Sequence, residues 1–178
     1  IKTLPGVSSA NELSSQYSVR GGNFDENLDY VNGIEIYRPF LISSSQQEGL
    51  SFINSDLVSE INFSSGGFEA KYGDKMSSVL DIKYIVPKKN KTSISTSLLG
   101  TNFHTQGVSK NKKTSFLIGL RYKTTNYILN SLDTDAEYRP RFFDVQSSFN
   151  FKILDYWNLN ILSNYNYNNY LMVPTSRD

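Results

Sequence analysis

The chain has 178 residues and a formal net charge of +1, and no stretch of it is long and apolar enough for a membrane-spanning helix. The near-balance of 18 basic and 17 acidic residues excludes the broad basic field of a nucleic-acid-binding protein. There is no cysteine and a single histidine, His104, so we expect no enzymatic activity, metal or cofactor. Aromatic residues make up 13% of a chain otherwise rich in small polar residues, which favours strands over helices.

Residues 1–87 predict short strands separated by glycine turns. We expect strands at 17–20, 28–31, 34–37, 57–63 and 79–85, and a short helix over 46–53. Asn32-Gly33 is the strongest two-residue signal for a β-hairpin. Pro87 and the charged stretch after it do not suit a central strand, so we predict one domain over 1–87 and a second over 88–178.

Residues 88–178 predict five strands with strict alternation of polarity. These are expected at 92–100, 102–109, 114–128, 142–154 and 157–170. Alternate side chains of a strand point to opposite faces, so each strand has one apolar, largely aromatic face and one face of Asn, Gln, Ser, Lys or Arg. The residues that we expect to face lipid are Phe116, Ile118, Leu120, Tyr122, Phe149, Phe151, Leu159 and Ile161.

The connections between these strands alternate in length. Residues 110–113 and 155–157 form short connections, whereas 130–141 form a long one. Short turns at one rim and long loops at the other are typical of outer-membrane β-barrels. A soluble β-sandwich also alternates, but it places aliphatic residues inside and more Glu–Lys pairs outside, so the pattern favours the barrel.

Six segments of the first half resemble, in order, the motifs of one family. Together they resemble the plug domain of TonB-dependent outer-membrane receptors, in the form found in Bacteroidetes-type bacteria. Each segment alone is a weak signal, whereas their common order over residues 4–82 is a strong one. The segments are LPGV (4–7), YSVRGG (17–22), YVNGIEI (30–36), DLVSEINF (56–63), GGFEAKYGD (66–74) and SSVLDI (77–82).

This resemblance implies a mainly β fold, in which a plug of a small mixed sheet with short helices lies inside a transmembrane antiparallel barrel of about 22 strands. We therefore expect the chain to hold the later part of the plug and only about the first five barrel strands. The implied location is the bacterial outer membrane. The implied function is active transport of a siderophore, glycan, peptide or similar substrate, with the plug gating the barrel.

The resemblance also implies roles for individual residues. Arg20 matches the family arginine that holds the plug to carboxylates of the barrel wall, whereas the family's second arginine is replaced by the stretch Ser65-Gly66-Gly67. The loops that face substrate in relatives contain Phe24, Tyr37, Arg38 and Phe40 here, and packing among neighbouring loops is an equal alternative for them. The expected turn residues are Gly21, Gly22, Asn32, Gly33, Gly66, Gly67, Tyr72 and Gly73.

The implied partners are TonB, outer-membrane lipid, an unidentified transported substrate and, as an optional partner, a surface lipoprotein. The TonB-binding box is expected to lie outside this sequence, and no nucleic acid is expected. Two alternatives stay open on the sequence. One is a plug-and-barrel subunit that does not transport and serves in docking, signalling or secretion. The other is a soluble β-rich adhesin or binding module.

Overall fold

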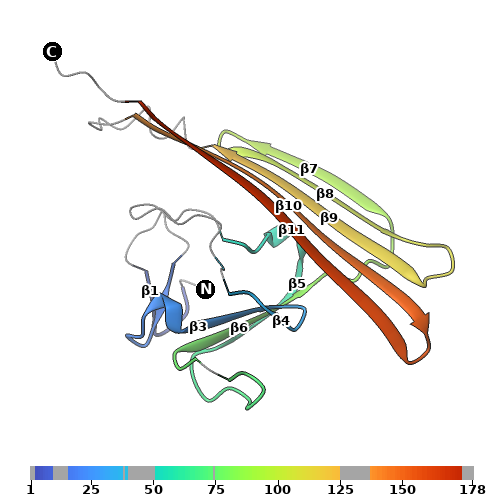
Figure 1. Cartoon of the computed structure of the whole chain (residues 1–178), viewed down its shortest axis with the longest axis horizontal. Helices are drawn as coiled ribbons and strands as arrows, with labels where there is room; N and C mark the ends of the chain where they lie inside the picture. Colours follow the sequence, from blue (N-terminus) through green and yellow to red (C-terminus); the bar gives the residue numbers. More distant parts are fainter. Residues whose placement is uncertain are drawn as a thin grey trace. The chain divides into compact units, whose positions relative to one another are not determined.

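The computed structural model describes residues 3–9, 16–37, 39, 51–73, 75–124 and 137–173, with only the backbone for 137–140 and 170–173. It is almost entirely β and divides into two compact units, Ile1–Ile85 and Val86–Asp178 (Figure 1). Within the described ranges, none of the helical segments has the length and apolar character needed to cross a membrane.

The first unit is built on a four-stranded mixed sheet with the order β4-β3-β6-β5. Its strands are β3 (Asn27–Val31), β4 (Ile34–Glu35), β5 (Val58–Ser64) and β6 (Ser78–Tyr84). β3 pairs in parallel with β6, and β4 and β5 pair antiparallel at the two edges. The β3–β4 hairpin turns at Asn32 and Gly33, whose φ angles of 52° and 79° are those of the predicted Asn-Gly turn.

A second, two-stranded antiparallel pair joins β1 (Val7–Ser8) and β2 (Ser18–Val19). Two short 3₁₀ helices, η1 (Phe24–Glu26) and η2 (Ser55–Leu57), precede β3 and β5. The helix expected over 46–53 lies mostly outside the described residues, and residues 51–53 are not helical. The sequence analysis did not predict β1.

The core of the first unit lies on its two central strands. Buried aliphatic side chains come from both β3 and β6, because each of these strands has a neighbour on both sides. Burying one such side chain contributes roughly 1.5–3 kcal/mol to folding. The core side chains include Val19, Leu28, Val31, Leu57, Val79, Leu80 and Ile82, each at most 2% exposed.

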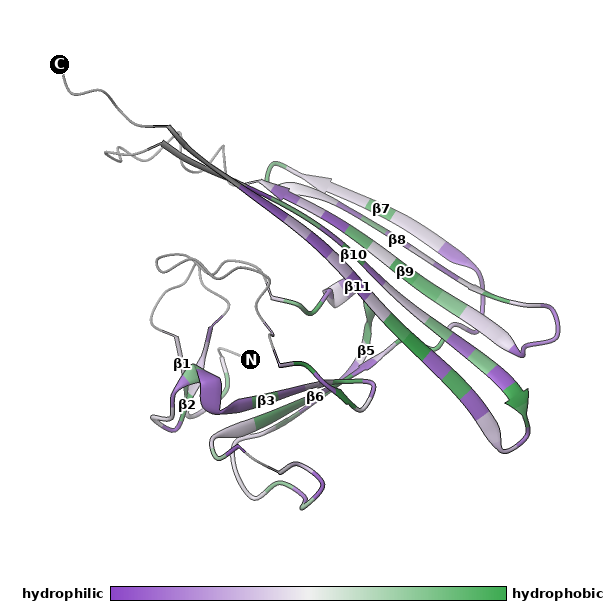
Figure 2. Ribbon diagram, viewed as in Figure 1, coloured by the Kyte–Doolittle hydropathy of each residue, from purple (hydrophilic) through white to green (hydrophobic). Residues whose placement is uncertain are grey.

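The second unit is a five-stranded antiparallel sheet in which every strand pairs with its neighbour in sequence, giving the order β11-β10-β9-β8-β7. The strands are β7 (Lys91–Ser97), β8 (Gly100–Val108), β9 (Thr114–Thr124), β10 (Glu137–Leu154) and β11 (Trp157–Val173). Figure 2 shows hydrophobic and hydrophilic bands alternating along β9, β10 and β11. This up-and-down order with alternating polarity is the arrangement expected of barrel strands.

The register aligns these alternating residues into two continuous faces. One cross-strand row of the apolar face runs Ile94, Phe103, Leu120, Val145 and Tyr165. The neighbouring row of the polar face runs Ser95, Asn102, Arg121, Asp144 and Asn166. The polarity predicted for single strands is therefore coherent over the whole sheet.

β10 begins earlier than the sequence indicated. We expected a loop up to residue 141, but the strand starts at Glu137 and includes Pro140. Pro140 pairs with Tyr170 of β11, while the pairing with β9 ends at the Arg141–Thr124 pair. Among the described residues, the segment before Arg141 thus has a neighbour on one side only, which is where a sheet tolerates proline.

Gly100, at the start of β8, gives a testable prediction about the second unit. Its φ is +149°, and a Cβ there would lie 2.0 Å from the carbonyl oxygen of Tyr122. Backbone cannot move aside as a flexible side chain does, so Gly100→Ala should lower the free energy of unfolding by about 1–3 kcal/mol. Urea unfolding of the full-length protein measures this. Gly73→Ala is the control, because nothing lies within 4 Å of its Cβ position. An equal effect of both substitutions would contradict the prediction.

Candidate functional site

Several loops of the first unit meet at one end of its sheet. Because β3 and β6 are parallel and begin as partners at Asn27 and Ser78, the segments that lead into both strands lie at the same end. β4 and β5 run antiparallel to these strands, so the segments that follow them reach this end too. The residues brought here include Phe24, Tyr37 and the Gly66-Gly67 turn.

Arg20 lies where three of the sequence motifs converge. Its backbone N–H donates to the carbonyl of Gly6 at 2.8 Å. Its Nη1 lies 3.3 Å from the Cβ position of Gly66, and its Cγ lies 3.6 Å from that of Gly6. Its φ of 50° is positive, which is uncommon for a residue other than glycine. The residue is exposed, and no ion pair to it is seen within the described part of the chain.

The expected turn residues differ in what they do. Position 22 requires glycine because the Ser77 side chain lies close to its backbone. A Cβ there would lie 1.7 Å from Ser77 Oγ and 3.0 Å from Ser77 Cβ. Gly73 has neither a positive φ nor a heavy atom within 4 Å of its Cβ position. Tyr72 is more than a turn residue: its hydroxyl donates to Asp81 Oδ2 at 2.8 Å, which ties its loop to β6. Positive φ is found at Gly21, Asn32, Gly33, Gly66 and Gly67.

Side chains of β3, of β6 and of the residue just before β6 fix the segment that contains β2. Asn27 Nδ2 donates to the carbonyl oxygen of Tyr17 at 2.9 Å, and Asn27 Oδ1 accepts from Ser78 Oγ at 2.7 Å. Ser77 Oγ donates to the carbonyl of Val19 at 3.3 Å. These side-chain contacts provide the segment with partners that a continuous sheet would otherwise supply.

Asp29 is a carboxylate inside this polar cluster. It is 5% exposed, and its Oδ1 accepts from the hydroxyl of Tyr17 at 3.4 Å. Burial disfavours the charged form and raises the pKa of Asp29 from 3.8 to about 6, against an opposing effect of the Tyr17 hydrogen bond. Burial, followed by the nearby Asp29 charge, also raises the pKa of Tyr17. The cluster therefore holds a group that titrates in the mildly acidic range.

The Asp29 carboxyl should make the first unit less stable at neutral pH than at acidic pH. The folded state binds this proton up to about pH 6, whereas the unfolded chain releases it near pH 3.8. The free energy of unfolding therefore falls as the pH rises through this window, by an amount on the order of 3 kcal/mol.

Asp29→Asn should remove this dependence and increase amide hydrogen-exchange protection of Leu28 and Val31 at pH 8 in the full-length protein. Exposed Asp25 supplies the control, and Asp25→Asn should leave protection unchanged. Weaker protection in the Asp29→Asn variant at pH 8 would refute the proposed cost of the buried charge.

The polar face of the second unit contains a buried ion pair between neighbouring strands. Arg121 of β9 donates to Asp144 of β10 through Nε at 2.6 Å and through Nη2 at 2.9 Å. Gln146 Nε2 donates to Asp144 Oδ2 at 3.1 Å. The Arg121 and Asp144 side chains are 6% and 1% exposed. This fork-to-fork geometry gives the carboxylate three donors, as a buried charge requires.

The eight residues expected to face lipid lie on the apolar face of the second unit. Cross-strand pairing joins Phe116 with Phe149, and Phe149 with Ile161. Leu159 pairs with Phe151 on the same face, where Phe116, Tyr122, Leu159 and Ile161 are between 36% and 46% exposed. Contact of this face with lipid stays a prediction.

The residues expected to face substrate are only partly described. Phe24 lies in η1 and is 46% exposed, and Tyr37, after β4, is 84% exposed. Both lie at the same end of the sheet, whereas Arg38 and Phe40 lie outside the described residues. Among the described side chains, no group of His, Asp and Glu is arranged to hold a metal ion.

Sequence reasoning missed the pairing of Arg121 with Asp144 and the burial of Asp29. The alternation of polarity assigned Arg121 and Asp144 to polar faces of their strands. The register between β9 and β10 was not predictable, because a long connection joins these two strands. For the burial of Asp29, the signal was a lone carboxylate between Leu28 and the apolar end of β3. A charge inside a predicted core strand indicates a buried, partnered group.

Comparison with known proteins identifies the family of the first part of the chain. Residues 1–79 match the family model of the TonB-dependent Receptor Plug Domain. No curated protein sequence matches the chain. The chain therefore contains the plug domain of a TonB-dependent receptor and belongs in the bacterial outer membrane, and its second unit has the fold of the first barrel strands.

Solved structures share this fold. The siderophore receptor PirA from Acinetobacter baumannii aligns over 93% of this chain with 18% identity and a TM-score of 0.61. A mutant of the ferric enterobactin receptor PfeA from Pseudomonas aeruginosa, in complex with enterobactin, aligns over 95% with 15% identity and a TM-score of 0.61. The chain spans 28% and 30% of the lengths of these two proteins.

Proposed function

We propose that the protein to which this chain belongs carries a substrate across the outer membrane by TonB-dependent active transport. The observation that carries this proposal is the plug domain over residues 1–79, followed directly by strands with one apolar and one polar face. In this function the plug closes the barrel, and force transmitted by TonB opens it. Transport of this kind requires no covalent catalysis by the protein, so we propose no enzymatic role.

Uptake measurements in whole cells test the proposal. The full-length receptor is expressed in a strain that lacks its own copy, and uptake is measured for labelled ferric siderophores, glycans and peptides. Siderophores are the first class to test, because the similar PirA structure is a siderophore receptor. Uptake of at least one substrate should depend on the receptor, on TonB and on the inner-membrane proton gradient. Substrate binding without uptake would instead support a docking or signalling subunit.

Phe24 and Tyr37 are the described residues that we propose to contact substrate. Their support is exposure of both aromatic rings at one end of the plug sheet. Replacing both by Ser should raise the substrate concentration for half-maximal uptake about fivefold or more, as loss of a significant aromatic contact does. Ile34→Ser, at an exposed residue next to the β3–β4 turn and away from that end, is the control. Unchanged half-saturation in the double variant would assign both rings to loop packing.

Arg20 keeps its proposed role in holding the plug to the wall. The support is its exposed guanidinium, held at the meeting point of the Gly6 and Gly66 turns. Its proposed partner is a carboxylate of the barrel wall. The remaining barrel is the proposed source.

A further inference from the structure

One rim of the second unit is strongly basic. Three segments meet there because the strands alternate in direction: the lead into β7, the β8–β9 turn and the β10–β11 turn. The lead is fixed to β8, since Gln106 Nε2 donates to the carbonyl oxygen of Lys89 at 3.2 Å and Val108 N–H donates to Asn90 Oδ1 at 3.1 Å. The exposed charges of this rim are Lys88, Lys89, Lys91, Lys110, Lys112, Lys113, Lys152 and Asp155.

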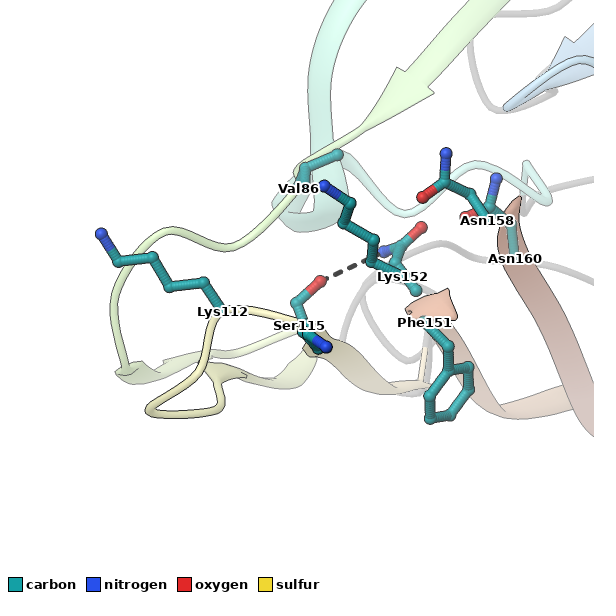
Figure 3. A pocket seen from close by; sticks show the side chains of 9 residues that line it. Val86, Lys112, Ser115, Phe151, Lys152, Asn158 and Asn160 are labelled. Atoms are coloured by element: carbon teal, nitrogen blue, oxygen red, sulfur yellow. Dashed lines mark hydrogen bonds between the residues drawn. The ribbon is translucent and has the colours of Figure 1, made fainter. Parts of the chain in front are cut away.

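A pocket of about 350 Å³ lies at this rim (Figure 3). Its wall includes Lys112 and Lys113 from one turn and Lys152 from the end of β10. Its polar lining is Ser115, Asn150, Asn158 and Asn160, and Asn150 Nδ2 donates to Ser115 Oγ at 3.5 Å. Lysines from two separate segments thus line a pocket whose other polar groups are amides and hydroxyls.

The ammonium charge of this pocket is mostly uncompensated. Lys152 Nζ pairs with Asp155 Oδ1 at 2.8 Å, and that aspartate side chain is 96% exposed. Within the described part of the chain, neither Lys112 nor Lys113 has a carboxylate within ion-pair distance. Charges of one sign collected around a concave surface attract an anionic partner and raise its association rate.

The lining indicates a peptide rather than a lipid. Cross-strand pairs join Ser115 with Asn150 and Asn150 with Asn160, and all three belong to the polar face, opposite the face of Phe116 and Phe149. The acyl chains of a bound lipid would have to lie on the apolar face, away from the pocket. Asparagine side chains donate and accept hydrogen bonds in the way that a peptide backbone requires.

We propose that this pocket, lined by Lys112, Lys113, Lys152, Ser115, Asn150, Asn158 and Asn160 together with Val86 and Phe151, binds an acidic peptide segment. Carboxylates of the segment pair with the lysines, and its backbone lies on the asparagines. The rim opposite the pocket carries the longer connection over 125–136, so the basic rim is the periplasmic one. The segment therefore belongs to a protein in the periplasm. Only this direction of approach rests on the proposed transport function.

Fluorescence anisotropy with the full-length receptor in zwitterionic nanodiscs tests the proposal. The probe is a labelled decapeptide of alternating Glu and Ser, and the comparison peptide has Gln in place of each Glu. The acidic peptide should bind more tightly, and its affinity should fall as salt is added. Lys113→Gln should weaken binding about two- to fivefold, and the Lys112→Gln/Lys113→Gln/Lys152→Gln variant about tenfold or more.

Two controls separate this site from a general effect of charge. Lys123→Gln removes one charge from the other end of β9 and should leave the affinity unchanged, whereas Lys113→Arg should retain binding. Equal affinity of both peptides, or full affinity of the triple variant, would overturn the proposal.

A second experiment compares peptide with lipid. Phosphatidylglycerol in the nanodiscs should not displace the acidic peptide, and displacement would assign the rim to lipid headgroups instead. The binding assay does not depend on uptake, so failure of this proposal and failure of the transport proposal are separate results.

Discussion

Arg121→Met should lower the free energy of unfolding of the receptor by about 3–5 kcal/mol. The substitution keeps most of the side-chain volume but removes the charge that neutralises Asp144, which is 1% exposed. Gln146 alone then remains as a side-chain donor to that carboxylate among the contacts described above. The stranded charge, rather than the lost contact, accounts for most of the expected cost.

A double substitution distinguishes these two causes. Arg121→Met combined with Asp144→Leu removes both charges and should recover most of the stability, because an apolar pair of similar volume often replaces a buried ion pair without loss. Lys152→Met is the control, since it breaks an exposed pair of the same sheet and should cost less than about 1 kcal/mol. Urea unfolding of the full-length receptor measures all variants. A double variant as unstable as Arg121→Met alone would show that the lost attraction, and not the stranded charge, accounts for the cost.

Leu120→Lys should lower the free energy of unfolding in a lipid bilayer by about 2–4 kcal/mol if the apolar face lies in the bilayer. Leu120 is the middle residue of the row from Ile94 to Tyr165, with Phe103 and Val145 as direct partners. A lysine at that depth exposes its charge to hydrocarbon, whereas the same change on a water-exposed face has little effect. The result thus reports whether hydrocarbon or water surrounds the apolar face.

Asn164→Lys provides the matched control on the opposite face. Asn164 is exposed and pairs with Gln146 across the polar face. A lysine there should leave the folded fraction in lipid bilayers unchanged, measured by the mobility shift of unheated samples on SDS gels. If Leu120→Lys is equally well tolerated, the apolar face does not contact lipid.

Local patterns predicted most of the single elements. Alternation of polarity in β9, β10 and β11 predicted both faces correctly, because side-chain direction in a strand depends only on position. The Asn32-Gly33 turn was predicted for a similar reason, since its positive φ angles are a local requirement. The mainly β fold was also predicted. The plug domain was predicted by resemblance, and the family match over residues 1–79 confirms it.

Properties that depend on distant partners were not predictable. The start of β10 at Glu137 depends on pairing with β11 up to Val173, which overrides the loop-like composition around Pro140. The contact of Arg121 with Asp144 depends on a register that a connection of a dozen residues leaves free. The burial of Asp29 depends on Tyr17, twelve residues away, and on the parallel pairing with β6. The Bacteroidetes-type origin stays a prediction.

The parallel pairing of β3 with β6 determines when the plug sheet can form during synthesis. Asn27 and Ser78, which begin the two strands, are 51 residues apart, and closing so long a loop precedes any gain from pairing. The hairpin of β3 and β4 forms locally, but two strands alone are marginal in water. The plug must therefore stay incomplete until the residues just before the first barrel strand have been made.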